Sequence, residues 1–150
     1  MPKIDPNAPD TPRRAGSRYP DPYNTPCADR SAVRLGLAGG LTDFGVNIIT
    51  VPAGTWSSQR HAHDADDEFL MMIEGELVLI EEEGRTPMRA GDFAAFPKAT
   101  SGGHHLINES DAPARFLVIG ANKGGATYPD IDLLYVQGER GYRHKDGTAY

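Results

Sequence analysis

Two histidines and a carboxylate stand close together near the middle of the chain. His61 and His63 are separated by one residue, Glu68 follows after four more, and another histidine, His104, comes later. Because alternate side chains of a β-strand share a face, His61 and His63 would point to the same side of a strand. Imidazole and carboxylate ligands suit Mn, Fe, Ni, Co or Zn better than Ca. The pattern therefore predicts a site for one divalent transition metal ion.

Glu68 begins an apolar run that continues to Ile73. On a strand, Leu70 and Met72 would lie on the face of Glu68. The opposite face, which carries Phe69 and Ile73, would be apolar as well, so we expect this strand to be covered on both sides. An ionised carboxylate on a buried face is costly unless it is paired or coordinated. Glu68 is therefore the acidic residue that we expect to act at the site.

Short apolar runs separated by turn residues fill the chain from about residue 32 onward. The expected strands are 46–51, 68–73, 76–80, 88–89, 93–96, 104–107 and 115–119. Short strands with frequent turn signals indicate an all-β sandwich or barrel, and the absence of sustained helical periodicity leaves little room for helix. The acidic run from Glu81 to Glu83, which precedes Gly84, predicts a solvated hairpin tip.

Proline sets the first part of the chain apart. Seven of the twelve prolines lie between Pro2 and Pro26. Proline lacks a backbone N–H and cannot hold a helix interior or a central strand, so we expect an extended arm. The predicted division is a Pro-rich arm over residues 1–31, one barrel over 32–136 and a polar tail over 137–150. Tyr19 and Tyr23 would anchor the arm on the barrel or on a neighbouring subunit.

Charge and cysteine content exclude several classes of protein. The chain has 150 residues and a formal net charge of −6, which argues against nucleic acid or an anionic membrane as a partner. Cys27 is the only cysteine, so no disulfide can form within one chain. We find no apolar signal segment and no run long enough to span a membrane. These features predict a cytoplasmic protein without a membrane partner.

Two sets of residues resemble the two sequence motifs of the cupin superfamily. The first set, spaced much like the first motif, comprises Gly54, His61, His63, Glu68 and Gly75. The second set comprises Gly91, Pro97, His104 and Asn108. The motifs cover residues 54–108, and the strand pattern extends the resemblance over about residues 32–136.

The resemblance implies a fold, a ligand set and an assembly. The fold is a double-stranded β-helix, or jelly-roll barrel, with one divalent metal ion in its mouth. The implied ligands are His61, His63, Glu68 and His104. Cupins of this size are commonly homodimers, so a homodimer is expected here as well.

The spacing departs from the family pattern in two places. Six residues separate Gly54 from His61, which is one more than the family usually has. Six residues also separate Pro97 from His104, where the family has the histidine sooner. A short loop insertion would leave the ligand in place, but it makes His105 an alternative to His104. His104 is preferred because it would share a strand face with Asn108.

Four further residues are candidates for supporting roles. Gln59 and Arg60 flank the site, and either could hold a polar or anionic substrate, with a solvent-facing position as the alternative. Asn108 would fix a ligand or a turn by hydrogen bonding. Tyr128 is either a substrate contact or a structural lead-in to a strand. If the substrate carried a phosphate, its partners would be drawn from the basic residues Arg60, Arg89, Lys98 and Arg115.

Three functions fit such a site. The leading one is an isomerase-type enzyme in which the metal acts as a Lewis acid on a polar, oxygen-rich small molecule, such as a sugar, sugar phosphate or keto acid. Glu68 would then be a catalytic residue, both as a ligand and as a base. The first alternative is an Fe(II)-dependent dioxygenase. The second is a barrel that binds a small ligand without catalysis.

Overall fold

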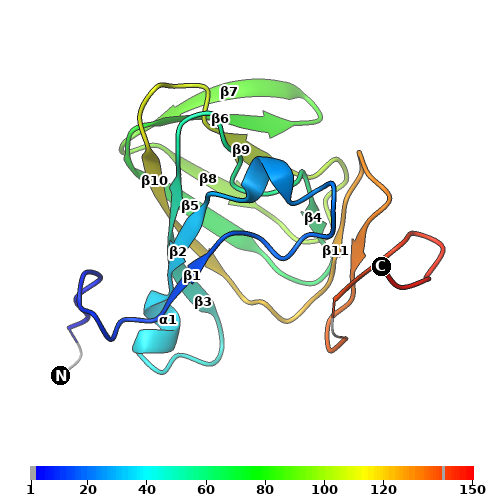
Figure 1. Cartoon of the computed structure of the whole chain (residues 1–150), viewed down its shortest axis with the longest axis horizontal. Helices are drawn as coiled ribbons and strands as arrows, with labels where there is room; N and C mark the ends of the chain where they lie inside the picture. The colour runs from blue at the N-terminus through cyan, green and yellow to red at the C-terminus, as the bar shows by residue number, and fades with distance from the viewer. Residues whose placement is uncertain (1–2, 140) are drawn as a thin grey trace.

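The structure is a computed structural model and describes residues 3–139 and 141–150. Its elements are nearly all strands (Figure 1). In chain order they are β1 (Arg13–Ala15), η1 (Thr25–Cys27, a 3₁₀ turn), β2 (Ser31–Val33), α1 (Leu35–Ala38), β3 (Gly45–Val51), β4 (Ala62–His63), β5 (Glu68–Glu74), β6 (Glu76–Glu81), β7 (Gly84–Arg89), β8 (Phe93–Phe96), β9 (His105–Ile107), β10 (Ala114–Gly120), β11 (Ala126–Thr127), β12 (Leu134–Tyr135) and β13 (Tyr142–Arg143). The prediction of an all-β chain with little helix is confirmed.

The largest sheet has the strand order β1-β2-β3-β10-β5-β8, and its neighbouring strands are antiparallel. β3 is rich in β-branched residues, which suit the pleated backbone, and it pairs with β10 from Val51 with Ala114 to Gly45 with Gly120. β5 pairs with the other side of β10 and places Glu68 opposite Phe96 of β8. Glu68 is thereby held at the first position of a central strand.

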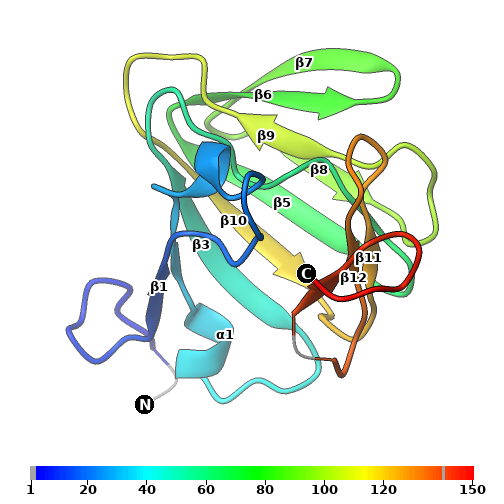
Figure 2. The same cartoon turned by 45° about the vertical axis from the view of Figure 1, so that its right-hand side comes forward.

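A second sheet, of order β7-β6-β9, faces the first. β6 and β7 form a hairpin in which Glu81 pairs with Gly84, so Glu82 and Glu83 make the turn, as the acidic run predicted. Gly84 has a φ of 140°, which suits glycine. In Figure 2 the hairpin extends beyond the end of the large sheet.

The main hydrophobic core lies between these two sheets. It draws side chains from β3 and from β5 to β10, and its buried members are Val51, Leu70, Met72, Leu77, Leu79, Met88, Phe96, Leu106, Ala114 and Phe116. Fully burying a side chain of the size of leucine or phenylalanine contributes about 1.5–3 kcal/mol. This core fixes β5 and β9, the two strands at which the candidate ligands Glu68 and His104 are found.

The prediction that β5 is covered on both faces is wrong for the single chain. Leu70 and Met72 are buried on the inner face, but on the outer face Phe69 is 42% exposed and Ile73 is 37% exposed. Phe93 of the neighbouring strand β8 lies opposite Met71 and is 60% exposed. The period-two pattern places the side chains on the correct faces, but it does not show whether another layer covers the outer one.

A third sheet, of order β13-β12-β11-β4, lies at one side of the barrel and carries a second apolar cluster (Figure 2). Tyr19 of the arm is 8% exposed and packs edge-on against Tyr128 and in a tilted arrangement against Tyr142. Tyr23 packs edge-on against Tyr150. Tyr19 and Tyr23 therefore contact Tyr128 and two tyrosines of the tail, while an arm anchored on the barrel or on a neighbouring subunit remains a prediction.

Each end of the chain adds a short edge strand. β1 of the arm pairs only with β2 at the edge of the large sheet, as expected for a Pro-rich segment. β13 of the tail pairs with β12. The domain boundaries at residues 31/32 and 136/137 remain a prediction. No helix in the described part of the chain is long and apolar enough to cross a membrane.

Candidate metal centre

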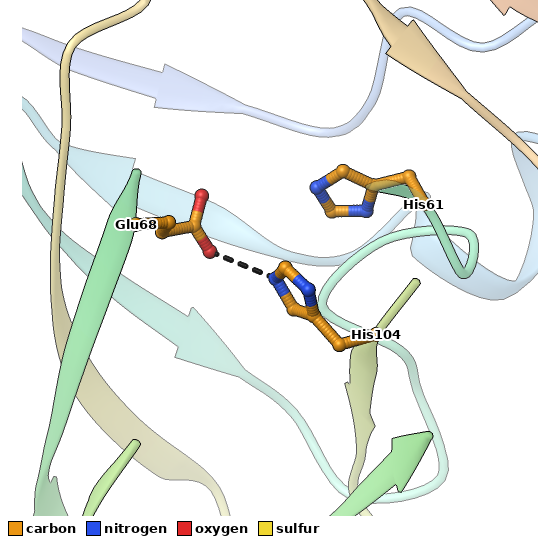
Figure 3. A group of neighbouring side chains, drawn as sticks. All are labelled: His61, Glu68 and His104. Carbon is orange, nitrogen blue, oxygen red and sulfur yellow. Dashed lines mark hydrogen bonds and ion pairs between the residues drawn. The ribbon is translucent and has the colours of Figure 1, made fainter. Parts of the chain in front are cut away.

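Three segments bring the candidate ligands together in the barrel. His61 and His104 form an antiparallel bridge in which each backbone N–H donates to the carbonyl of the other, at N–O distances of 3.1 and 2.8 Å. His63 is the last residue of β4, and Glu68 is the first residue of β5. In Figure 3, Glu68 reaches from its strand toward the imidazole of His104, with His61 beside it.

The side-chain atoms of this cluster are close neighbours. Nε2 of His63 lies 3.2 Å from Nε2 of His61 and 3.1 Å from Oε2 of Glu68. Nε2 of His104 lies 3.1 Å from Oε1 of the same carboxylate. Ligand atoms of His61, Glu68 and His104 all lie within 4.8 Å of one another. His63 is not a member of this group of three, but it contacts two of them, His61 and Glu68.

Neighbouring groups fix the orientation of two imidazoles. Nδ1 of His61 lies 2.9 Å from the carbonyl oxygen of Gln59, so the ring N–H at Nδ1 donates there and leaves the Nε2 lone pair directed at the cluster. The His104 ring stacks on Phe96, with ring centroids 3.5 Å apart and an interplanar angle of 5°. Phe96 and Glu68 face each other across β8 and β5, so one strand pair positions both the carboxylate and the stacking surface.

The electrostatics of the cluster favour an ionised Glu68 and a neutral His61, whereas His63 is shifted toward its charged form. Burial lowers the pKa of His61 to about 3, and the neighbouring His104 acts in the same direction. Burial alone would raise the pKa of Glu68, but hydrogen bonds from His104 and His63 hold it well below its usual value. The pKa of His63 is raised, because its hydrogen bond and attraction to Glu68 outweigh the effect of burial.

Comparison with known proteins identifies the family. The family model described as a cupin domain matches residues 47–120. A solved sugar phosphate isomerase of the cupin superfamily from Silicibacter pomeroyi DSS-3 is 42% identical, with 99% of this chain and 96% of that chain covered and a TM-score of 0.91. The chain belongs to the cupin superfamily.

Other structures agree with this assignment. A putative sugar phosphate isomerase from Acidithiobacillus ferrooxidans is 27% identical, covers 82% of this chain and 81% of its own, and has a TM-score of 0.71. A predicted oxalate decarboxylase from Thermotoga maritima is 19% identical, with 62% and 80% of the two chains covered and a TM-score of 0.54, and shows the fold alone. The comparison with curated proteins gave no match. The cupin fold is the predicted double-stranded β-helix.

The donor atoms of this cupin fit the metal ion that the family implies. Two ligands at ~2.1 Å from an octahedral ion, with a right angle between them, lie ~3 Å apart. The contacts of His63 with His61 and Glu68, and of His104 with Glu68, measure 3.1 to 3.2 Å. Metal binding also requires an ionised carboxylate and neutral imidazole, the states favoured for Glu68 and His61. A set of imidazole and carboxylate ligands suits a divalent transition metal ion.

Of the two adjacent histidines, His104 is the one that reaches Glu68 in this cupin. His105 points to the other side of its strand, where Nδ1 lies 2.9 Å from the carbonyl oxygen of Ser58 and the ring packs edge-on against Trp56. Burial lowers the pKa of His105, so it is held as a neutral donor to the backbone. Its hydrogen bond ties β9 to the loop that carries His61.

The supporting residues expected from the sequence have different positions. Tyr128 lines the cavity above the cluster, with its ring centroid 5.9 Å from that of His61. The side chain of Gln59 donates to the carbonyl of Tyr23 at 2.8 Å and so holds the arm, while its own carbonyl orients His61. Arg60 forms a two-pronged ion pair with Asp130, at 2.7 and 2.6 Å, outside the cavity.

Asn108 holds a turn rather than the candidate ligands. Its Nδ2 donates to the carbonyls of Val51 and Ala112, each at 2.8 Å, and its Oδ1 accepts from the backbone and hydroxyl of Ser110. With 2% of its surface exposed, Asn108 joins β3 to the connection between β9 and β10. Of the two roles considered for it, the structure shows the turn.

The cavity around the cluster also contains residues that the sequence analysis did not select. Its volume is about 320 Å³. The arm contributes Arg14, Arg18, Tyr19 and Arg30, and the tail contributes Tyr142. Tyr19 was selected only as an anchor of the arm, and no local pattern marks the others, because they reach the cavity only when the arm and the tail fold back on the barrel.

Asp66 is the second carboxylate in the cavity wall, and both of its oxygens accept hydrogen bonds from backbone N–H groups. It lies in the loop before β5 and is buried. Its oxygens accept from the N–H groups of Lys123 and Gly124 at 2.9 to 3.0 Å. Asp66 therefore fixes the loop that follows β10.

Proposed function

We propose that this cupin is a metal-dependent enzyme of the isomerase type, acting on a small molecule rich in hydroxyl and carbonyl groups. The proposal is carried by one observation: ligand atoms of His61, Glu68 and His104 lie within 4.8 Å of one another, and His63 contacts His61 at 3.2 Å and Glu68 at 3.1 Å. Isomerase chemistry on a sugar or sugar derivative is supported by the similarity to the sugar phosphate isomerase from S. pomeroyi, which extends over 99% of this chain.

The residues of the cluster would have two roles, metal binding and proton transfer. His61, His63, Glu68 and His104 would hold the ion, which supplies Lewis-acid polarisation of a carbonyl or hydroxyl group. Of the two carboxylates in the cavity wall, Asp66 is occupied by backbone N–H groups, so Glu68 is the candidate base. Hydrogen bonds from His104 and His63 lower its pKa and keep it ionised, as a ligand must be. To act as a base it would have to leave the ion and these hydrogen bonds, because a carboxylate held at a low pKa accepts a proton weakly.

Tyr128 would contribute a hydroxyl donor. Burial raises its pKa, so the phenol stays protonated at neutral pH, and its ring lies beside His61 in the cavity. A protonated phenol can donate to an oxygen on which negative charge develops during the reaction. The apolar faces of the tyrosines would also exclude water from that oxygen.

Turnover by metal-loaded protein tests this function. Metal-free protein is loaded separately with Mn, Zn, Ni, Co or Fe, mixed with a panel of aldoses, ketoses and their phosphates, and followed by proton NMR with and without O2. We expect interconversion of one substrate pair without O2 consumption. Glu68→Gln should lower kcat by about 10²-fold or more, the usual contribution of a positioned acid or base.

Two other outcomes would contradict the proposal. Turnover that requires Fe and consumes O2 would establish the dioxygenase alternative. A small molecule that binds tightly and is recovered unchanged with every metal would establish a non-catalytic binding barrel.

The expected homodimer and cytoplasmic location remain proposals. The exposed apolar face formed by Phe69, Ile73 and Phe93 supports a dimer, because large exposed apolar patches mark interaction surfaces. A two-fold axis would bring this face of one copy against the same face of another. A reducing compartment is consistent with Cys27, whose burial raises the thiol pKa to about 11.

A further inference from the structure

The arm places three arginines in the wall of the cavity that contains the candidate metal centre. Arg14 lies on β1, Arg18 follows in the connection from β1 to η1, and Arg30 directly precedes β2. β1 and β2 pair with Arg14 opposite Ala32, and the N–H of Gly16 donates to the carbonyl of Arg30 at 2.8 Å. The pairing of these two short strands therefore gathers the three cations at one rim of the cavity.

These cations have no acidic partner within the described residues. Five arginines farther along the chain each pair with a carboxylate: Arg60, Arg85, Arg89, Arg115 and Arg143. Across residues 3–139 and 141–150, no ion pair or side-chain hydrogen bond involves Arg14 or Arg18. Because these guanidinium groups line a cavity and have no carboxylate partner in the described part of the chain, they offer positive charge to an anion inside it.

The cations also disfavour one another. Burial and the charges of Arg30, Arg18 and Arg34 lower the pKa of Arg14. Arg30 is held in place by the carbonyls of Gly16 and Ser57, and its guanidinium lies 6.0 Å from the ring centroid of Tyr19. An anion bound between the guanidinium groups would relieve this repulsion, and the fixed position of Arg30 would reduce the entropy lost on binding.

We propose that Arg14, Arg18 and Arg30 form a subsite for the phosphate group of a phosphorylated substrate, whose oxygen-rich end reaches the metal centre. This assignment rests on the proposed function and adds a substrate class to it. Several guanidinium groups match the charge of a phosphate monoester better than that of a single carboxylate, and each presents a planar fork to the phosphate oxygens. Asn47 and Asn122 lie in the same cavity wall and offer amides to hydroxyl groups of the substrate.

The assignment replaces the basic residues that the sequence suggested for a phosphate. Arg60, Arg89 and Arg115 are engaged with Asp130, Glu76 and Glu74, respectively. None of these three arginines, nor Lys98, lines the cavity of the metal centre. The arm would therefore be part of the active site as well as a cover for the barrel.

Binding of inorganic phosphate, measured by isothermal titration calorimetry on metal-loaded and metal-free protein, tests the subsite. We expect one phosphate to bind in both forms. Arg14→Ala and Arg18→Ala should each weaken binding about tenfold or more, the usual loss for a charged hydrogen bond. Arg13→Ala is the matched control: it removes the same charge from the neighbouring position of β1, where Arg13 contacts the carbonyl of Pro6 outside the cavity. It should leave the affinity nearly unchanged.

Parallel measurements separate this proposal from the proposed function. Metal content, determined by elemental analysis, should be the same in Arg14→Ala, Arg18→Ala and the parent. His104→Ala should lose metal but still bind phosphate. Thermal melting of each variant confirms that it is folded.

Three results would overturn the subsite. Arg14→Ala and Arg18→Ala could bind phosphate as the parent does, which would remove the arm from recognition. Phosphate binding could disappear with the metal, which would assign the anion to the ion itself. Acetate could bind as tightly as phosphate in the same titration, which would replace the phosphorylated substrate with a carboxylated one.

Discussion

At the scale of single residues, the candidate centre depends on which group accepts the hydrogen bond from the N–H of each imidazole. His61 donates from Nδ1 to the carbonyl of Gln59, and His105 donates from Nδ1 to the carbonyl of Ser58. Both acceptors lie in the loop that precedes β4, but only the bond of His61 leaves an Nε2 that contacts another member of the cluster, Nε2 of His63 at 3.2 Å. The backbone of the loop from Ser57 to His61 therefore decides which histidines are available for coordination.

Removing a coordinating imidazole should remove the ion. We expect protein purified without added metal to carry near one equivalent of a transition metal, and His63→Ala and His104→Ala to retain little of it, because each substitution deletes a donor atom 3.1 Å from Glu68. Elemental analysis of the purified proteins measures this.

His144→Ala is the matched control for that experiment. His144 pairs with Asp132 and stacks on Tyr150, away from the cavity, so its variant should keep the full equivalent. Full metal content in His104→Ala would exclude the four-ligand centre.

Alternation of side chains along a strand predicted that only one of His104 and His105 would point inward. Both are buried and both line the cavity, but His104 contacts Glu68 whereas His105 bonds to the carbonyl of Ser58. Alternation could not assign Gln59 or Asn108, because their partners are backbone carbonyls that the fold brings near from distant segments. The choice between a substrate contact and a solvent-facing position was left open for Arg60 for a related reason. Its partner Asp130 is far along the chain, so the pairing that removes Arg60 from the cavity has no local signature.

At the scale of elements, the bridge between His61 and His104 depends on the glycine that precedes it. Gly103 has a φ of +68°, and a Cβ added there would lie 2.6 Å from the carbonyl carbon of His61. The chain therefore turns into β9 directly against the backbone that carries His61. A side chain at this position would separate the two segments that present the histidines.

We expect Gly103→Ala to lower both the free energy of unfolding and the metal content. The left-handed backbone costs a non-glycine residue roughly 1–2 kcal/mol, and the contact with His61 adds roughly 1–3 kcal/mol for a forced backbone shift. Urea denaturation and elemental analysis measure the two effects.

Gly54→Ala is the control that separates the cost of a left-handed backbone from the cost of the contact between Gly103 and His61. Gly54 has a φ of +74°, but a Cβ added there meets nothing within 4 Å, so this variant should show only the backbone cost and keep its metal. Equal losses in the two variants would show that the approach of Gly103 to His61 does not matter.

Strand positions were predictable because apolar runs and turn residues are local features. The expected strand 93–96 is reproduced as β8, and the others agree within about two residues at each end, apart from β7, which extends from Gly84 rather than starting near Met88. β7 was underestimated because Arg85, Thr86 and Pro87 are polar or unsuited to a central strand, and β7 is an edge strand, where such residues are tolerated.

At the scale of the whole molecule, the exposed face around Phe93 is the feature that the single chain leaves unexplained. If two copies meet through it, sedimentation equilibrium should give twice the chain mass of 16.2 kDa. Phe93→Lys should give a monomer, because a buried unpaired charge at the interface is costly and Phe93 is 60% exposed in the single chain.

Leu37→Lys is the control for that change. Leu37 lies on α1 and is 53% exposed, so the substitution alters a comparable apolar side chain outside the face of β5 and β8. This variant should remain a dimer. A monomeric parent protein, or a dimeric Phe93→Lys, would exclude this interface.

The candidate ligands and part of the cavity wall come from different segments of the chain, and these segments can change independently during evolution. The candidate ligands lie between residues 61 and 104, whereas part of the cavity wall comes from the two ends of the chain, through Arg14, Tyr19 and Tyr142. Inherited changes at either end can therefore reshape what the cavity accepts without disturbing the ion. A lineage with this arrangement is able to acquire a new substrate while it keeps its reaction chemistry.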